Sequence, residues 1–279
     1  MDLALGESSI VVTDASSGSP LRLYDRASGV LTDSVDAVGE GPGELRRVWS
    51  LHQMHPNNFA SVDVANRNTF HLHVTETKKM ALSGFRPMPT EGMVTHVLQS
   101  DSTVSTVLGG SFGSQRFIEV AADGQVLRKF GDLPILLSNT GTDYDLRGEY
   151  RASPDGSKAV VVLTRADIIE IHDLRSGEPL AITWGPFEHD PLNGDRGYID
   201  VSAGSDAIYA LLSFQSDLHP SHLGNTILAF DWTGELKGRI ILDGGFTALA
   251  VDESSSEFFL SRHDPTPAIV KVRIPEGLR

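Results

Sequence analysis

The chain contains no cysteine among its 279 residues. This absence excludes disulfide bonds, thiolate metal sites and cysteine nucleophiles, and it leaves the redox compartment of the protein open. No apolar run approaches the roughly 18 residues that a membrane-spanning helix needs, so membrane insertion is not expected. The first residues, Met1 to Gly6, lack the basic and apolar regions of a signal peptide. The chain as given is therefore expected to be soluble.

Positive charge is also scarce. The chain has 23 Lys and Arg against 37 Asp and Glu, a net charge of −14. Because no basic run or stripe interrupts this excess, nucleic acid and anionic membrane surfaces are excluded as expected partners. The hydrophobic fraction of 40% with 22% charged residues is that of a globular protein with a real core. All-β architectures of this length often form one domain, so we expect a single domain over residues 1–279.

A turn led by Asp or Gly recurs along the whole sequence. Since the first interval spans two repeats, the mean period is about fifty residues, which is typical of propeller blades or repeat arrays. Four copies of this turn are Asp25 to Gly29, Ala122 to Gly124, Asp173 to Gly177 and Asp231 to Gly234.

The segments around these turns have the patterns of strands. Apolar residues alternate with histidine in Phe70 to Val74, which predicts a strand with two different faces. Ala159 to Leu163 and Ala207 to Leu212 are apolar throughout, as expected for strands covered on both faces by neighbouring blades. These patterns predict an all-β fold, a six-bladed β-propeller of four-stranded antiparallel blades.

The number of blades follows from a second set of turns, between the first and second strands of each repeat. The six turns begin at Gly6, His55, Ser100, Ser153, Gly204 and Asp252. The last blade ends after its third strand, near Ile274, so the closing blade is expected to be incomplete. Propellers avoid such an unpaired edge by completing one blade with strands from both termini. We expect that the closing strand was removed together with an export signal.

Four segments carry a resemblance to a known family. They are the sequence Gly-Glu-Gly-Pro-Gly-Glu at Gly39 to Glu44, and Tyr150 to Lys158, Ile227 to Gly234 and Ala248 to Glu253. Together they resemble the six-bladed TolB-like propellers, and the first is also similar to the NHL repeat. The resemblance implies a binding or scaffold role and an exported or lipid-anchored protein. The chain shows neither a signal nor a lipobox cysteine, so localisation stays open, with export of a form whose N-terminal signal is absent here as the expectation.

The glycine-rich segment is expected to be a structural loop between two blades. Glycines permit positive φ and close approach of backbones, and proline stiffens the turn. Its Glu is expected to cap exposed amides or to reach the central channel; a ligand-binding loop is the alternative. The residues of this loop are Gly39, Gly41, Pro42, Gly43 and Glu44.

Three loops are rich in the residue types that dominate recognition surfaces. They span Leu133 to Arg151, Trp184 to Tyr198 and Phe214 to Asn225. We expect them to form a ligand-binding rim; the alternative is that the aromatic residues pack between blades and the arginines pair with the acidic excess. The predicted rim residues are Tyr144, Arg147, Tyr150, Arg151, Trp184, His189, Arg196, His219 and His222.

Metal sites are weaker candidates. His71 and His73 lie two residues apart on one strand face, and Asp217, His219 and His222 share one loop, but the sequence fixes no complete ligand set. Some six-bladed propellers are calcium-dependent lactonases with acidic ligands at the channel mouth. The residues on equivalent loops here are Glu44, Asp143, Asp145 and Asp195.

No cofactor is expected, with calcium as the alternative. No nucleophile elbow, phosphate loop or zinc-protease helix motif is present, and no catalytic residue is assigned. The preferred hypothesis is a non-catalytic propeller that binds a protein, peptide or small ligand through one rim. The alternative is a calcium-dependent hydrolase of the lactonase or esterase kind, and a third is a structural module of a larger exported assembly.

Overall fold

The computed structural model describes residues 2–13, 19–36, 38–41, 43–100, 105–133, 147–186, 196–214, 223–262 and 268–278. In this part of the chain, 23 β-strands are accompanied by a single 3-10 helix, Glu276–Leu278. The strands form six sheets, five with four strands and the last with three. The predicted all-β fold with six blades and an incomplete last blade is therefore confirmed.

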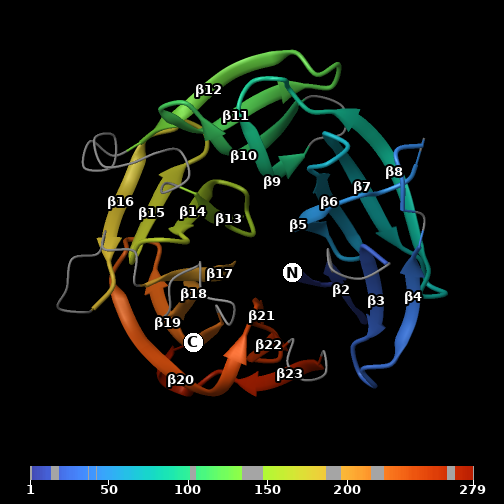
Figure 1. Ribbon diagram of the computed structural model, residues 1–279. Helices are drawn as coiled ribbons and strands as arrows, with labels where there is room; N and C mark the ends of the chain where they lie inside the picture. The colour runs from blue at the N-terminus through green and yellow to red at the C-terminus, as the bar shows by residue number, and fades with distance from the viewer. Residues whose placement is uncertain are drawn as a thin grey trace. The chain divides into compact units, whose positions relative to one another are not determined.

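The chain divides into two compact units. The first comprises Met1–Phe112 and Phe117–Lys129, and it contains the first two blades and most of the third. Figure 1 shows the strands of each blade lying side by side in chain order. The strands of these three blades are β1 (Asp2–Leu5), β2 (Ser9–Thr13), β3 (Leu21–Asp25), β4 (Leu31–Val35), β5 (Val48–His55), β6 (Asn58–Asp63), β7 (Asn68–Val74), β8 (Met80–Pro87), β9 (Met93–Ser100), β10 (Ser105–Phe112), β11 (Gln115–Ala121) and β12 (Val126–Asp132).

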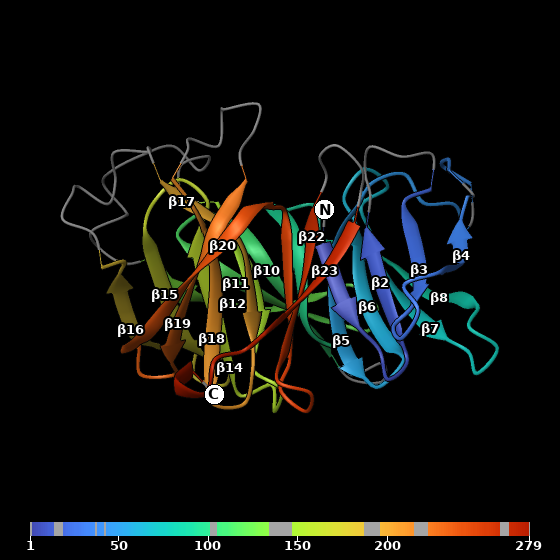
Figure 2. The same ribbon diagram turned by 90° about the horizontal axis from the view of Figure 1, so that it is seen from below.

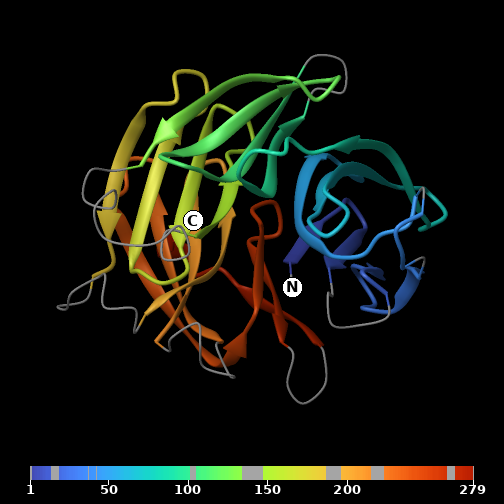
Figure 3. The same cartoon turned by 45° about the horizontal axis from the view of Figure 1, so that its top comes forward.

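The second unit comprises Gly113–Arg116 and Phe130–Arg279 and contains the last three blades. The fourth blade is the yellow-green sheet of Figure 3, and the sixth is formed by the red strands. The strands of these blades are β13 (Gly148–Ala152), β14 (Lys158–Leu163), β15 (Ile168–Asp173), β16 (Pro179–Trp184), β17 (Gly197–Ala203), β18 (Ala207–Ser213), β19 (Gly224–Asp231), β20 (Leu236–Phe246), β21 (Ala248–Asp252), β22 (Glu257–Arg262) and β23 (Ala268–Arg273).

The turns that ended the predicted third strands have the expected conformation. Gly29 and Gly234 have φ values of 70° and 86°, a left-handed conformation that glycine adopts without a steric penalty. In the first of these turns, the carboxylate of Asp25 accepts a hydrogen bond of 2.7 Å from the backbone N–H of Ser28. The side chain thus replaces a backbone partner, which is why Asp leads the repeat.

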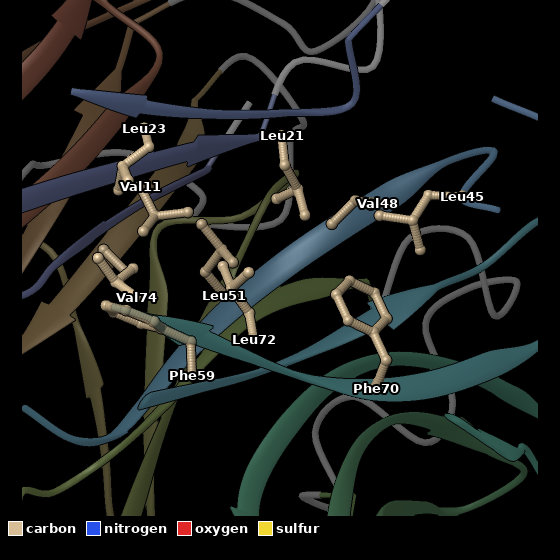
Figure 4. Close-up of a cluster of buried hydrophobic side chains, with 11 residues drawn as sticks. Val11, Leu21, Leu23, Leu45, Val48, Leu51, Phe59, Phe70, Leu72 and Val74 are labelled. Atoms are coloured by element: carbon tan, nitrogen blue, oxygen red, sulfur yellow. The ribbon is translucent and has the colours of Figure 1, made fainter. Parts of the chain in front are cut away.

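The core lies between the faces of neighbouring blades within each unit. In the first unit, Val11 and Leu21 of the first blade pack with Leu51 and Phe70 of the second. Figure 4 shows these side chains turned toward one another. In the second unit, a corresponding cluster joins the fourth and fifth blades and another joins the fifth and sixth. Burial on both faces explains why β14 and β18, the second strands of the fourth and fifth blades, are almost entirely apolar.

Two aspartates of first strands join one blade to the next. Asp2 accepts a hydrogen bond of 2.7 Å from the backbone N–H of Leu51, and Asp200 accepts one of 2.8 Å from that of Leu249. Both pairs are separated by 49 residues. Both carboxylates are buried, so each bond is shielded from water. This repeated link between blades was not predicted from the sequence.

Among the described residues, no helix is long and apolar enough to cross a membrane.

Candidate binding rim

One end of the fourth and fifth blades carries several of the predicted site residues. Because adjacent strands are antiparallel, the start of β13, the end of β14 and the start of β15 lie at the same end of their sheet. A side chain at Gly197, the first residue of β17, would overlap the backbone oxygen of Thr164, so the two blades meet at this end. In Figure 2 this end of β17 points to the top. We call this end of the second unit the rim, formed by Arg147, Thr164 to Asp167, Trp184 to Pro186, Arg196, Gly197, Ser213 and Phe214.

The rim exposes two large aromatic side chains. Trp184 is 41% exposed and Phe214 is 43% exposed, although both residues belong to types that are usually buried. The guanidinium of Arg196 lies 5.1 Å from the centre of the Phe214 ring, a cation–π arrangement. Trp184 ends the outermost strand of its blade and lies opposite Ile168 in the register of β15 and β16.

Three arginines lie at this end of a strongly acidic chain. The backbone oxygen of Arg147 accepts a hydrogen bond of 3.0 Å from the N–H of Thr164, which places Arg147 beside the turn that carries Arg165. Arg196 precedes Gly197, the residue that touches Thr164. All three arginine side chains are half-buried and take part in interactions with their surroundings. Their guanidinium groups give the rim the donors and positive charge that suit carboxylate or phosphate groups.

A buried acid and a buried phenol support the rim from below. The hydroxyl of Tyr198 donates a hydrogen bond of 2.8 Å to the carboxylate of Asp167. Burial, and next the negative charge of Asp167, raise the pKa of the Tyr198 hydroxyl well above its ordinary value of 10.0. The lack of a side chain at Gly185 leaves room for this carboxylate, because a Cβ there would overlap it. The pair therefore fixes the turn between β14 and β15 against the start of β17.

The predicted rim residues divide into three groups. Arg147, Trp184 and Arg196 lie at the rim. Tyr150 is buried within β13, and Arg151 donates a hydrogen bond of 3.1 Å to the buried carboxylate of Asp200, so both lie inside the blades. The remaining predictions, Tyr144, His189, His219 and His222, lie outside the described residues. The structure adds two residues that the sequence analysis did not include among the predicted rim residues: Phe214, which begins one of the predicted loops, and Arg165, which lies in none of them.

A buried polar network inside the blades was also missed. Arg116 is 1% exposed and contacts both carboxylate oxygens of Glu170, at 3.0 and 2.5 Å. Nε2 of His172 contacts Oε2 of the same carboxylate at 3.1 Å, and Arg116 also bonds the hydroxyl of Tyr150. Every member of the network is buried, so we assign it a structural role. It explains why Tyr150, predicted as a rim residue, is held inside.

The glycine-rich loop lies between β4 and β5, where one blade passes to the next. The carboxylate of Glu44 accepts a hydrogen bond of 2.8 Å from the N–H of Gly41, and a side chain at Gly39 would overlap the same carboxylate. The side chain of Asn66 closes the loop by donating to the backbone oxygen of Gly39 at 2.9 Å. Glu44 thus caps its own loop. Pro42 lies outside the described residues.

The described residues contain no group of three His, Asp or Glu side chains that could hold a metal ion. His71 and His73 lie on β7, where Nδ1 of His73 contacts the amide oxygen of Asn58 at 2.9 Å. Of the four residues considered for calcium, only Glu44 is described, whereas Asp143, Asp145 and Asp195 lie outside these residues, as does Asp217.

Comparison with known proteins gives one family and one related structure of note. The dihydro-heme d1 dehydrogenase NirN, solved in complex with DHE, is 16% identical to this chain and superposes with a TM-score of 0.48. The match covers 99% of this chain and 55% of that one, so the chain spans about half the length of the solved protein. We draw no functional conclusion from this similarity. No curated protein matches the chain.

The family comparison agrees with the blade count. A family model described as TolB-like 6-blade propeller-like matches residues 1–254, which include strands of all six blades. The resemblance expected from the sequence is thereby confirmed. The chain belongs to the TolB-like family of six-bladed propellers.

Proposed function

We propose that the chain is a non-catalytic binding or scaffold protein whose protein, peptide or small-molecule ligand contacts the rim of the second unit. The observation that carries this proposal is the exposure of Trp184 and Phe214 beside the guanidinium of Arg196. Trp, Arg and large aromatic residues contribute a disproportionate share of the energy at recognition surfaces. A propeller also holds such residues on the ends of rigid strands, which lowers the cost of ordering them on binding.

The described acidic and basic side chains considered for a site support a binding role over a catalytic one. Asp167 is buried and accepts a hydrogen bond from the hydroxyl of Tyr198, so this carboxylate has a structural role. Of the acidic residues considered for a hydrolase, only Glu44 is described. Its carboxylate accepts a hydrogen bond from the N–H of Gly41 in its own loop. The arginines of the rim can donate hydrogen bonds but cannot act as general bases, since arginine stays protonated in proteins.

The test is a thermal-shift screen of a small-molecule and peptide library, followed by titration of each hit. A ligand that binds only the folded state raises the melting temperature. We expect hits to lose at least about tenfold in affinity in the variants Trp184→Ala and Phe214→Ala. Ile241→Ala is the matched control, because Ile241 is a large exposed side chain in the middle of β20.

Two outcomes would overturn the proposal. In the first, the hits bind the rim variants as tightly as the unaltered protein. In the second, mass spectrometry recovers the hits as hydrolysed products, and EDTA stops the conversion. The second outcome would favour the calcium-dependent hydrolase.

A further inference from the structure

The described part of the rim has a charge opposite to that of the chain. Its residues include three arginines, Arg147, Arg165 and Arg196, and one acidic residue, Asp167. The hydroxyl of Tyr198, which donates to Asp167, adds no negative charge near neutral pH, because burial raises its pKa well above 10.0. Positive charge is therefore in excess at this end of a chain whose net charge is −14.

The three arginines begin or follow strands of two neighbouring blades, and their backbones meet near Thr164. The backbone oxygen of Arg147 accepts hydrogen bonds from the N–H and the hydroxyl of Thr164, at 3.0 and 3.2 Å. A Cβ at Gly197 would lie 1.9 Å from the backbone oxygen of Thr164 and 2.9 Å from the backbone nitrogen of Arg165. Since Arg196 is the residue before Gly197, each arginine lies at this contact or one residue from it.

The guanidinium of Arg196 lies beside an exposed apolar surface. It is 5.1 Å from the centre of the Phe214 ring, and Phe214 is 43% exposed. A guanidinium has five N–H donors, so one that already contacts the protein can still donate to a ligand. Arg196 and Phe214 therefore present a group that binds anions next to a ring on which an apolar molecule can pack.

Arginine is the basic residue best suited to planar anions. Its fork of N–H groups donates two parallel hydrogen bonds to a carboxylate or a phosphate, whereas lysine acts as a point charge. The same unit contains an example, because Nε and Nη2 of Arg116 donate to the two carboxylate oxygens of Glu170. Within the described part of the rim every basic residue is an arginine.

We infer that the ligand of the rim is a small aromatic anion, in which a carboxylate or phosphate group lies next to an aromatic ring. The anionic group accepts hydrogen bonds from the guanidinium of Arg196, and the ring packs against the exposed part of Phe214. Arg147 and Arg165 add positive charge near the anionic group. The inference rests on the proposed function, because it names the chemical class of ligand for the same rim.

The experiment measures the binding of two anions to the full 279-residue chain by isothermal titration calorimetry. Indole-3-acetate carries a carboxylate and phenyl phosphate carries a phosphate, so the comparison identifies the anionic group. Their neutral counterparts are indole-3-acetamide and phenol. We expect at least one of the anions to bind, and to bind at least about tenfold more tightly than its neutral counterpart.

The variant Arg196→Gln removes the guanidinium and should weaken binding of the anion at least about tenfold. Arg239→Gln is the matched control, because Arg239 is an exposed arginine of β20 in the same unit and the substitution removes the same charge. Arg196→Lys keeps the charge without the planar fork and should weaken binding less than Arg196→Gln. The melting temperature of each variant without ligand shows whether it is folded.

Three results would overturn the inference. Neither anion binds at millimolar concentration, in which case the arginines serve the fold alone. An anion binds no more tightly than its neutral counterpart, in which case the rim does not recognise the charge. An anion binds Arg196→Gln as tightly as Arg239→Gln, which places it elsewhere. The proposed function survives each of these results if library hits still depend on Trp184 and Phe214, and it fails if that dependence is absent.

Discussion

At the scale of single residues, Glu170 is the clearest case of a charge that depends on its neighbours. Burial alone acts to raise the pKa of this carboxyl, because a charged group is costly to remove from water. The charge of Arg116, with hydrogen bonds from His172 and Arg116, outweighs this effect and holds the pKa of Glu170 below its ordinary value of 4.5. Glu170 is therefore charged in the folded protein at neutral pH.

The first prediction concerns the removal of this carboxylate. Glu170→Ala leaves the guanidinium of Arg116 buried without its main partner, and the free energy of unfolding should fall by about 3–5 kcal/mol. The double variant Arg116→Met, Glu170→Met removes both charges and should lose less. Urea unfolding at pH 7 measures both values. A loss from Glu170→Ala no larger than that of the double variant would contradict the role assigned to the ion pair.

The second prediction follows from the direction of the pKa shift. A carboxyl whose pKa is lower in the folded state stabilises the fold above its ordinary pKa, and this contribution is lost as the pH falls through its folded-state pKa. The advantage of the unaltered protein over Glu170→Gln should therefore be full at pH 7 and should shrink below pH 4.5. Urea midpoints of the two proteins at several pH values provide the measurement. An advantage that grows on acidification would show the opposite shift.

At the scale of the element, the strands that begin the blades carry the links between them. The carboxylate of Asp200 in β17 accepts hydrogen bonds of 2.8 Å from the backbone N–H groups of Leu249 and Val201. It also accepts a hydrogen bond from the guanidinium of Arg151. One side chain thus connects three consecutive blades of the second unit. Ser202 makes a simpler link, in which its hydroxyl oxygen accepts one hydrogen bond of 3.0 Å from the backbone N–H of Val251.

The third prediction compares these two links. Asp200→Ala leaves buried N–H groups and a guanidinium without their acceptor and should lower the free energy of unfolding by about 1–3 kcal/mol or more. Ser202→Ala removes one hydrogen bond and should cost about 1 kcal/mol or less. Chemical denaturation of both variants provides the comparison. Equal losses would mean that the aspartate contributes no more than one ordinary hydrogen bond.

The elements could be predicted from the sequence because each one is marked locally. Turns such as Asp25 to Gly29 need residues with a defined backbone or side-chain property, and strands such as Phe70 to Val74 show alternation over a few residues. The side-chain contacts that join one strand or blade to another have no such local sequence pattern. Arg116 and Glu170 are 54 residues apart, and in the sequence each is an ordinary polar residue of a strand. Their pairing depends on how two strands are packed, which periodicity does not encode.

The candidate site was predicted less completely for a related reason. Residue type singled out loops rich in Trp and Arg, and Trp184 and Arg196 lie at one end of the fourth and fifth blades, while their role in binding stays a prediction. Burial separates Tyr150 from them, because Tyr150 is the third residue of β13 and its hydroxyl bonds the buried Arg116. Phe214 begins one of the predicted loops but was not named among the rim residues, because its exposure, rather than its type, is unusual.

At the scale of the whole molecule, the acidic composition sets the response to salt. A net charge of −14 destabilises a compact state through repulsion between like charges. Salt shortens the range of this repulsion, from about 30 Å at 0.01 M to about 10 Å at 0.1 M.

The fourth prediction is that the melting temperature rises as NaCl is added from low to physiological concentration. Repulsion over the whole surface weakens with salt, whereas the exposed ion pairs that salt also weakens, such as Arg46 with Glu40, contribute little stability. Differential scanning calorimetry in buffers of increasing NaCl provides the measurement, with sucrose as a control for effects not due to charge. A melting temperature that falls with salt would mean that surface ion pairs outweigh the repulsion.

The bonds that Asp2 and Asp200 make to the next blade have a consequence for how such a chain can diverge. Each runs from a side chain to a main-chain N–H, and every residue except proline has one. The donor position, Leu51 or Leu249, can therefore change without breaking the bond, whereas the aspartate cannot. For the hydrogen bond, selection at these two boundaries acts on the aspartate alone, and the side chains of Leu51 and Leu249 are constrained separately by their packing in the core. A blade on the donor side can be duplicated, exchanged or rewritten while the bond that holds it stays the same.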